Sequence, residues 1–189
     1  MATMTRDPVA REAGPVPRAI TAARQPRRTV TPYVWAALRL LMGWTFLWAF
    51  IDKLFGLGFA TPAESAWVNG GSPTLGFLSF ATHGPLAGLY QTIAGNALVD
   101  AGFMAGLAGV GLSLLLGVGM RIGTLSGALM LLFIYTAGSM PPENNPFVHD
   151  RLVYAVIMIG LLASGSGRTL GLGRWWERTA LARTYPFLR

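Results

Sequence analysis

Arg39 is the residue whose type and position most directly suggest chemistry, because it lies inside a long apolar segment. It lies about 9 Å beyond Tyr33 along a helix that rises about 1.5 Å per residue. A cation at that depth is costly and usually functional. The sequence leaves three candidate binding partners for its guanidinium group: a ligand carbonyl, a helix end or a lipid phosphate. The alternative is that its long side chain reaches back toward the headgroups.

The same segment is rich in aromatic residues, among them Trp44 and Trp48. Flat rings beside a buried cation could hold a quinone head group between helices. We therefore assign Arg39, Trp44 and Trp48 to a predicted cofactor site for a quinone of the ubiquinone or menaquinone class. Ordinary core packing or contact with lipid is the alternative for the two tryptophans.

A second group of polar residues lies at the ends of the apolar segments: Asp52, Lys53, Asp100, Glu143, His149, Asp150 and Arg151. Lys53 and Arg151 are candidate substrate-binding residues, because both supply cationic donors for an oxyanion. Asp100, His149 and Asp150 are candidate catalytic residues that could carry protons. Simple ion pairing or exposed loop charge is the alternative for this group.

The sequence narrows the chemistry further, because it contains no cysteine. Thiol relays, disulfides and thiolate metal sites are excluded, and any redox chemistry needs a bound cofactor or a partner. His83 and His149 are the only histidines and have no ligand-like spacing. We predict no metal site.

The elements that must position these residues are four apolar segments. A helix needs about 17 to 25 residues to cross a hydrocarbon core of about 30 Å. The chain is 52% apolar and 12% charged, which is about half the charged fraction of a soluble domain. We predict an all-α integral membrane four-helix bundle with spans near 33–57, 97–118, 122–139 and 147–165.

Basic residues predict the topology. Twelve of the 15 Lys and Arg residues lie in the N-terminal tail, at Arg121, or from Arg168 onward. Basic loops stay cytoplasmic, so we predict that both termini and the Arg121 turn lie on the cytoplasmic side of a bacterial plasma membrane. The net charge of +7 therefore indicates contact with the lipid bilayer rather than with nucleic acid.

Residues 59–95 form a long loop that contains a further apolar stretch, GFLSFATHGPLAGLYQTIAG. His83, Gly84 and Pro85 interrupt it. A fifth crossing would put the two arginine-rich tails on opposite sides of the membrane. We therefore expect a helix or re-entrant segment on the outer face.

Three parts of the chain follow from these patterns. Residues 1–31 are predicted to be a disordered basic cytoplasmic tail, residues 32–166 the four-span domain, and residues 167–189 a basic amphipathic cytoplasmic tail with a short interfacial helix. Two GxxxG pairs, Gly102 with Gly106 and Gly123 with Gly127, predict close helix packing. Positions 39, 43, 46, 50 and 53 share one helical face, which we expect to point into the bundle.

Four segments carry a family resemblance: LRLLMGWTFLWAFIDKLFG, LLLGVGMRIGTLSGALM, NPFVHDRLVYAVIMIGLL and GSGRTLGLGRWWER. Over residues 34–176 the chain resembles the DoxX/DoxD family of four-helix membrane proteins, which includes the large subunit of thiosulfate:quinone oxidoreductase. Relatives commonly carry an aspartate where this chain has Gly173. The resemblance implies that electrons from thiosulfate enter the quinone pool with help from a small subunit.

Two functions are therefore expected from the sequence. The first is a membrane subunit of a quinone-linked oxidoreductase, with thiosulfate as a candidate donor. The alternative is a non-enzymatic membrane scaffold or partner of an envelope redox complex. Association of the chain with itself is open in both.

Overall fold

A computed structural model describes residues 30–138, 140, 142 and 148–188. This part of the chain is helical and contains no strand. The predicted N-terminal tail lies outside the described residues except for Val30 and Thr31.

Three helices are long and apolar enough to cross a membrane, and each coincides with a predicted span. A fourth helix, 15 residues long, occupies the fourth predicted segment and extends about 22 Å at about 1.5 Å per residue. The four are α1 (Thr31–Phe55), α4 (Ala97–Leu116), α5 (Met120–Gly138) and α6 (Asp150–Ser164).

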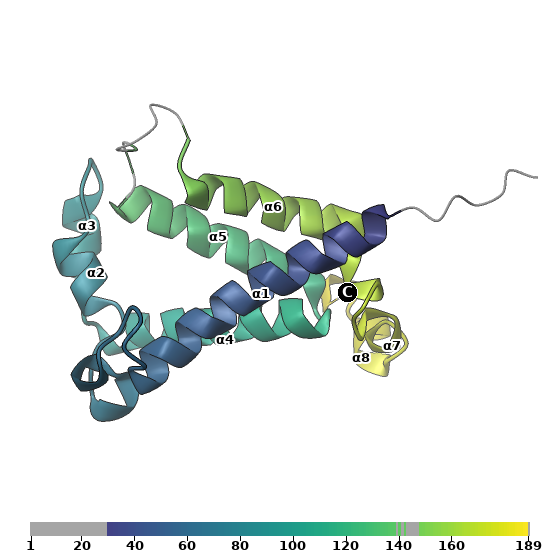
Figure 1. Cartoon of the computed structure of the whole chain (residues 1–189), viewed down its shortest axis with the longest axis horizontal. Coiled ribbons are helices and arrows are strands. Elements are labelled where there is room, and N and C mark those ends of the chain that lie inside the picture. The colour runs from purple at the N-terminus through teal and green to yellow at the C-terminus, as the bar shows by residue number, and fades with distance from the viewer. Residues whose placement is uncertain (1–29, 139, 141, 143–147, 189) are drawn as a thin grey trace, which may run out of the picture.

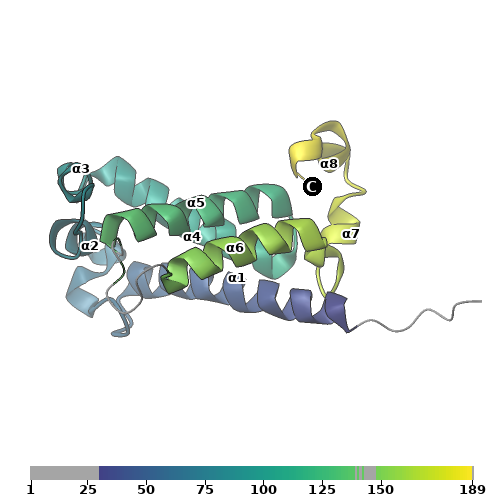
Figure 2. The same ribbon diagram turned by 90° about the horizontal axis from the view of Figure 1, so that it is seen from above.

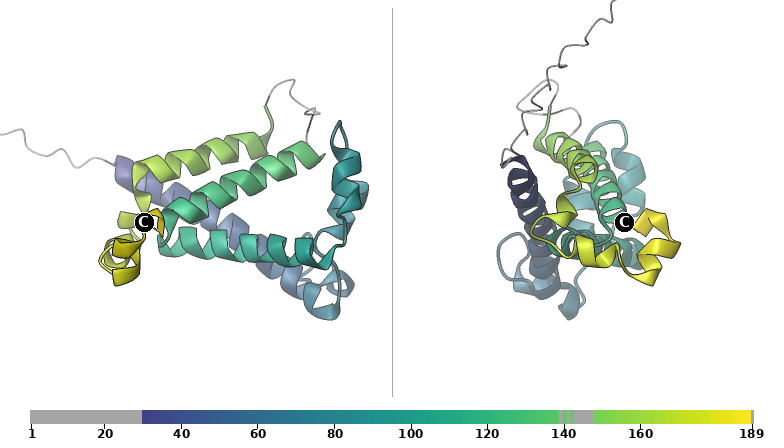
Figure 3. Two further views of the ribbon diagram at one scale, coloured as in Figure 1. Left: turned by 180° about the vertical axis from the view of Figure 1, so that it is seen from behind. Right: turned by 90° about the vertical axis from the view of Figure 1, so that its right-hand side faces the viewer.

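These four helices alternate in direction and pack together (Figures 1 and 2). Helix α1 packs mainly along α4, α5 along α6, and α4 joins the two pairs. We call the end that holds the start of α1 and the C-terminal segment the tail end, and the opposite end the loop end. The two pairs converge at the tail end and diverge toward the loop end (Figures 1 and 3).

The helix boundaries follow from residues suited to them. Gly56, Gly117 and Gly165 end α1, α4 and α6 with φ of 65°, 72° and 61°, the left-handed region that glycine adopts without a steric penalty. Asn96 caps the start of α4, because its side chain accepts a hydrogen bond of 2.9 Å from Leu98 N.

Apolar side chains from all four helices form the core, and α1 contributes the face expected from the sequence. Arg39, Gly43 and Phe46 are buried, and Phe50 packs against the core. Lys53 is half-buried. The remaining buried core side chains are Met42, Met104, Leu107, Val110, Leu114, Ala128, Leu131, Ala155, Met158 and Leu161.

Glycines set the closest helix approach, between α1 and α4. A Cβ on Gly43 would lie 2.9 Å from Leu114 Cβ, and one on Gly111 would lie 2.7 Å from Leu47 N. No larger residue fits either position without moving a helix.

The two predicted GxxxG pairs differ in outcome. Gly106, Gly123 and Gly127 each pack against a neighbouring side chain, whereas Gly102 is exposed with nothing within 4 Å. The first pair therefore contributes one close contact instead of two.

The long loop holds two short helices, α2 (Leu75–Phe80) and α3 (Ala87–Thr92), separated at His83–Pro85 as expected. Two 3-10 turns precede them, Ala63–Ser65 and Trp67–Asn69. The loop crosses the loop end and reaches α5, where His83 N donates to Ala137 O at 3.1 Å. The Tyr90 and Thr136 hydroxyls also lie 2.7 Å apart. Neither short helix is long enough to cross a membrane.

After α6 the chain folds back over the tail end in short turns. These are a 3-10 turn at Ser166–Arg168, α7 (Gly173–Trp176), α8 (Ala180–Thr184) and a 3-10 turn at Pro186–Leu188. Where the sequence predicts one short helix, the structure has two. Thr179 separates them, and its hydroxyl accepts a hydrogen bond from Ala182 N at the start of α8.

Candidate functional site

Arg39 is the most completely buried charged residue in the described part of the chain, with an exposed fraction of 0%. Its Nη1 donates hydrogen bonds to the main-chain carbonyls of Leu114 and, at 3.0 Å, Leu115. Both carbonyls belong to the last turn of α4, where helix carbonyls lack partners within the helix and carry partial negative charge. The cation therefore caps the C-terminal end of α4.

The other guanidinium nitrogen binds the chain beyond α6. Arg39 Nη2 donates to Leu170 O at 2.9 Å and to Thr169 O at 3.3 Å, while Nε has no hydrogen-bond partner among the described residues. Of the three partners that the sequence left open, the structure shows a helix end together with a loop. Arg39 thus joins three segments that are distant in sequence.

The segment 165–173 fits around this arginine because of its glycines. A Cβ on Gly171 would lie 3.1 Å from Arg39 Nη2, and one on Gly117 would lie 3.2 Å from Arg39 Nη1. A Cβ on Gly173 would lie 2.5 Å from Gly167 O. The GSGRTLGLG sequence therefore packs backbone against backbone around a buried guanidinium.

Trp44 and Trp48, the other members of the predicted quinone site, lie one turn apart on α1. Their ring centroids are 5.7 Å apart, and Trp48 meets Phe59 edge to face at 5.1 Å. Trp44 is 52% exposed. The rings thus form an aromatic surface group, while the hydrogen bonds of Arg39 all go to main-chain oxygens at the tail end.

Asp100 lies at the loop end in the first turn of α4 and is 5% exposed. Its Oδ1 accepts hydrogen bonds from Thr74 N at 3.1 Å and Thr74 Oγ1 at 2.5 Å. This carboxylate fixes the start of α2 to the start of α4.

Asp52 plays a similar part, a role that the sequence analysis did not assign to this member of the polar group. It is 2% exposed, and its carboxylate accepts from Phe59 N at 3.3 Å and Ala60 N at 3.0 Å. The signal available in the sequence was its place four residues before the glycine that ends α1. A carboxylate there can reach the amides of the following loop.

The remaining predicted site residues also lie at the loop end. Lys53 is on α1, Asp150 and Arg151 begin α6, and His149 directly precedes that helix. Glu143 lies outside the described residues. His149 Nδ1 accepts a hydrogen bond of 3.2 Å from Arg151 N, so this histidine caps α6. Its ring lies 6.3 Å from that of Tyr135. No described hydrogen bond or ion pair joins Lys53 or Asp100 to His149.

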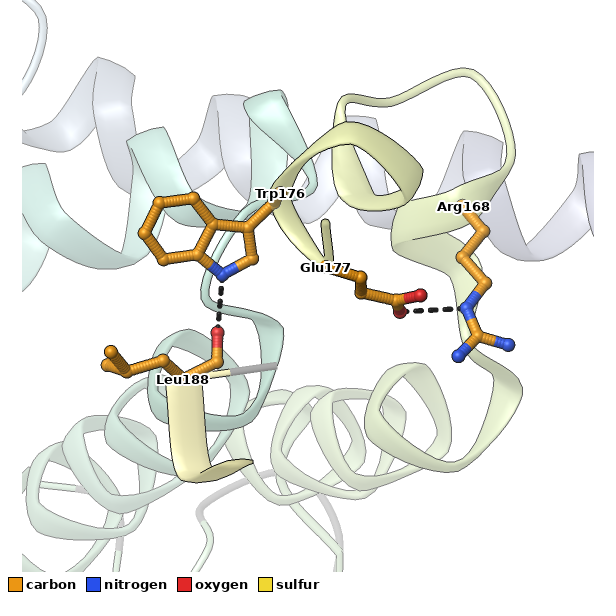
Figure 4. Close-up of polar contacts among 4 residues, drawn as sticks. All are labelled: Arg168, Trp176, Glu177 and Leu188. Carbon is orange, nitrogen blue, oxygen red and sulfur yellow. Dashed lines mark hydrogen bonds and ion pairs between the residues drawn. The ribbon is translucent and has the colours of Figure 1, made fainter. Parts of the chain in front are cut away.

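A pocket with a mixed polar and apolar lining, which the sequence did not predict, lies at the tail end. It has a volume of about 340 Å³. Arg168 Nε and Glu177 Oε1 form an ion pair of 2.8 Å at its edge, and Trp176 Nε1 donates to Leu188 O at 2.6 Å (Figure 4). The residues that line it are Gly117, Gly119, Met120, Arg121, Leu162, Ala163, Gly165, Gly167, Arg168, Gly173, Trp176 and Glu177.

Comparison of the chain with protein-family models, curated proteins and solved structures finds no match. The resemblance to the DoxX/DoxD family therefore stays a prediction from sequence.

Proposed function

We propose that the protein is a four-span integral membrane protein with both ends on the cytoplasmic side of a bacterial plasma membrane. Three apolar helices of sufficient length support membrane insertion. For α6, support comes from its outward face, where Val153, Val156 and Ile159 are 44%, 63% and 56% exposed. Four crossings also keep the arginine-rich ends together on one side.

Within the membrane, we propose that the protein acts as a non-enzymatic partner in an envelope redox complex. The observation that carries this is the use made of the buried ionisable side chains. Arg39 and Asp52 bind main-chain groups, and Asp100 binds Thr74. These side chains hold the fold together and do not converge on one reacting centre, and this supports a partner role over catalysis by the chain itself.

The test is gentle extraction of the full-length protein followed by mass spectrometry of the proteins and quinones that remain bound. We expect a stoichiometric protein partner and no quinone. Quinone bound at one equivalent, with no protein partner, would contradict the proposal. A second membrane protein of similar size, expressed and extracted in parallel, controls for general carry-over.

The second candidate function is a membrane subunit of a quinone-linked oxidoreductase, as the DoxX/DoxD resemblance implies. The aromatic group of Trp44, Trp48 and Phe59 favours it, because two adjacent rings on α1 and one from the loop after it offer an aromatic, apolar surface to a quinone. Lys53 and Arg151 would hold the anionic donor, thiosulfate being the candidate. A small subunit would complete the enzyme.

This candidate predicts thiosulfate-dependent quinone reduction in native membranes that contain the protein together with its small subunit. Trp48→Leu should lower that rate, whereas Trp175→Leu, a 62% exposed tryptophan outside the group, should not. Lys53→Ala should raise the thiosulfate concentration needed for half-maximal rate. Equal rates in membranes with and without the protein would remove this candidate.

A further inference from the structure

The pocket at the tail end combines cationic and apolar walls. Arg121 and Arg168 supply two guanidinium groups, and Met120, Leu162 and Trp176 supply apolar surface. Its location follows from three elements that meet there: the turn between α4 and α5, the end of α6, and the C-terminal segment. In the membrane arrangement proposed above, this is the depth at which headgroups meet acyl chains on the cytoplasmic side.

Both arginines keep donors available after their internal contacts. Arg168 uses Nε for Glu177, which leaves its two Nη groups outside that contact (Figure 4). Arg121 uses Nη1 for Pro186 O at 2.8 Å. A guanidinium has five N–H donors, so each side chain retains capacity to bind phosphate oxygens.

Charge at the pocket favours an anion. Arg121 and Arg168 outnumber the one carboxylate, Glu177, among the lining residues. The pocket also borders the first residues of α5, and the first N–H groups of a helix have no acceptor within the helix.

The apolar part of the lining distinguishes a lipid from a small anion. Met120, Leu162 and Trp176 border the same space as the arginines. An indole at interfacial depth is typical of sites where an apolar body meets a polar headgroup. A free phosphate would use the arginines and leave this surface uncovered.

We propose that the tail-end pocket binds the phosphate group of an anionic phospholipid, with Arg121 and Arg168 on the phosphate and the apolar wall against the glycerol and upper acyl chains. The proposal rests on insertion in the membrane but not on the partner or quinone functions. Its test therefore fails or succeeds independently of theirs.

The experiment uses the full-length protein in mild detergent, mixed with equal amounts of phosphatidylglycerol and phosphatidylcholine, and measures retained lipid by native mass spectrometry. The wild-type protein should retain phosphatidylglycerol preferentially. Arg121→Gln with Arg168→Gln should lower that retention about tenfold or more, because two charged hydrogen-bonding groups are lost. Arg174→Gln with Arg183→Gln removes the same charge from exposed positions outside the lining and should leave retention unchanged.

A variant that keeps every charge provides the second measurement. Ala163 is exposed and lines the pocket, so Ala163→Trp should fill the space and lower retention even if the arginine variant unfolds. Equal loss in the Arg174 and Arg183 control, or equal retention of the two lipids, would overturn the proposal. Displacement of the lipid by millimolar inorganic phosphate would assign the site to free phosphate and overturn the lipid assignment.

Discussion

Arg39 Nη2 lies 2.9 Å from the carbonyl oxygen of Leu170, a residue 131 positions later in the chain. The same guanidinium binds the end of α4 through Leu114 and Leu115. One side chain therefore joins the first long helix, the second long helix and the segment after α6. The exposed fraction of Arg39 is 0%, so we expect the packing of the tail end to depend on this side chain.

Replacing Arg39 should destabilise the protein even though it has no acidic partner among the described residues. Arg39→Leu should lower the free energy of unfolding by about 3 kcal/mol, because hydrogen bonds to a charged group are worth about 1.5–3 kcal/mol each. Arg39→Lys should recover only part of the loss, since an ammonium lacks the planar fork. Thermal unfolding in detergent measures both, with exposed Arg178→Gln as the control. A wild-type transition for Arg39→Leu would contradict the capping role.

Any side chain at Gly111 should destabilise the protein, because α1 and α4 are in close contact there. A Cβ there would lie 2.7 Å from Leu47 N, so Gly111→Leu should destabilise by about 3 kcal/mol, at the upper end of overpacking costs. Gly102→Leu is the matched control, because Gly102 lies on the same helix with open space around it. Similar unfolding temperatures for the two variants would argue against the close approach.

Leu170 has a left-handed backbone, with φ of 52°, and is the one non-glycine residue in the described ranges with positive φ. Leucine pays about 1–2 kcal/mol for that conformation, and glycine does not. Leu170→Gly should therefore be neutral or slightly stabilising. Leu172→Gly, at a φ of −82°, should destabilise by up to about 1 kcal/mol. Chemical unfolding of the two variants checks this, and we expect the higher midpoint for Leu170→Gly. A higher midpoint for Leu172→Gly would refute the prediction.

The buried Asp100 should couple energetically to Thr74. In a double-mutant cycle, Asp100→Ala and Thr74→Val should share a coupling of about 1–3 kcal/mol through the 2.5 Å hydroxyl contact. Unfolding free energies of the four proteins give this value. Additive effects would show that the hydroxyl contributes nothing, and the structural role of Asp100 would then rest on Thr74 N alone.

The absence of cysteine makes topology directly measurable. Single substitutions Glu64→Cys and Gln91→Cys, both exposed in the long loop, should react with an impermeant maleimide on intact cells. Arg178→Cys, exposed in the C-terminal segment, should react only after permeabilisation. Labelling of position 178 from outside would overturn the four-span topology.

The helices and the buried face of α1 could be predicted, because apolar length and the spacing of residues 39, 43 and 46 are local properties of the sequence. The break at His83–Pro85 was predictable for the same reason. The partners of Arg39 were not, since its carbonyl acceptors lie 75 to 131 residues away and main-chain oxygens leave no mark in side-chain composition. Gly102 is a second example. The GxxxG motif predicts which face of a helix packs closely, but the position of the neighbouring helix determines which of its glycines are in contact.

The bond between Arg39 and Leu170 also has a consequence for biosynthesis. A ribosome makes α1 first, and more than a hundred residues must follow before the carbonyls at 169 and 170 exist. Until then the guanidinium of Arg39 lacks two of its hydrogen-bond acceptors. Translation that stops after α6 would leave a chain in which two of the four carbonyl acceptors of Arg39, those of Thr169 and Leu170, are missing.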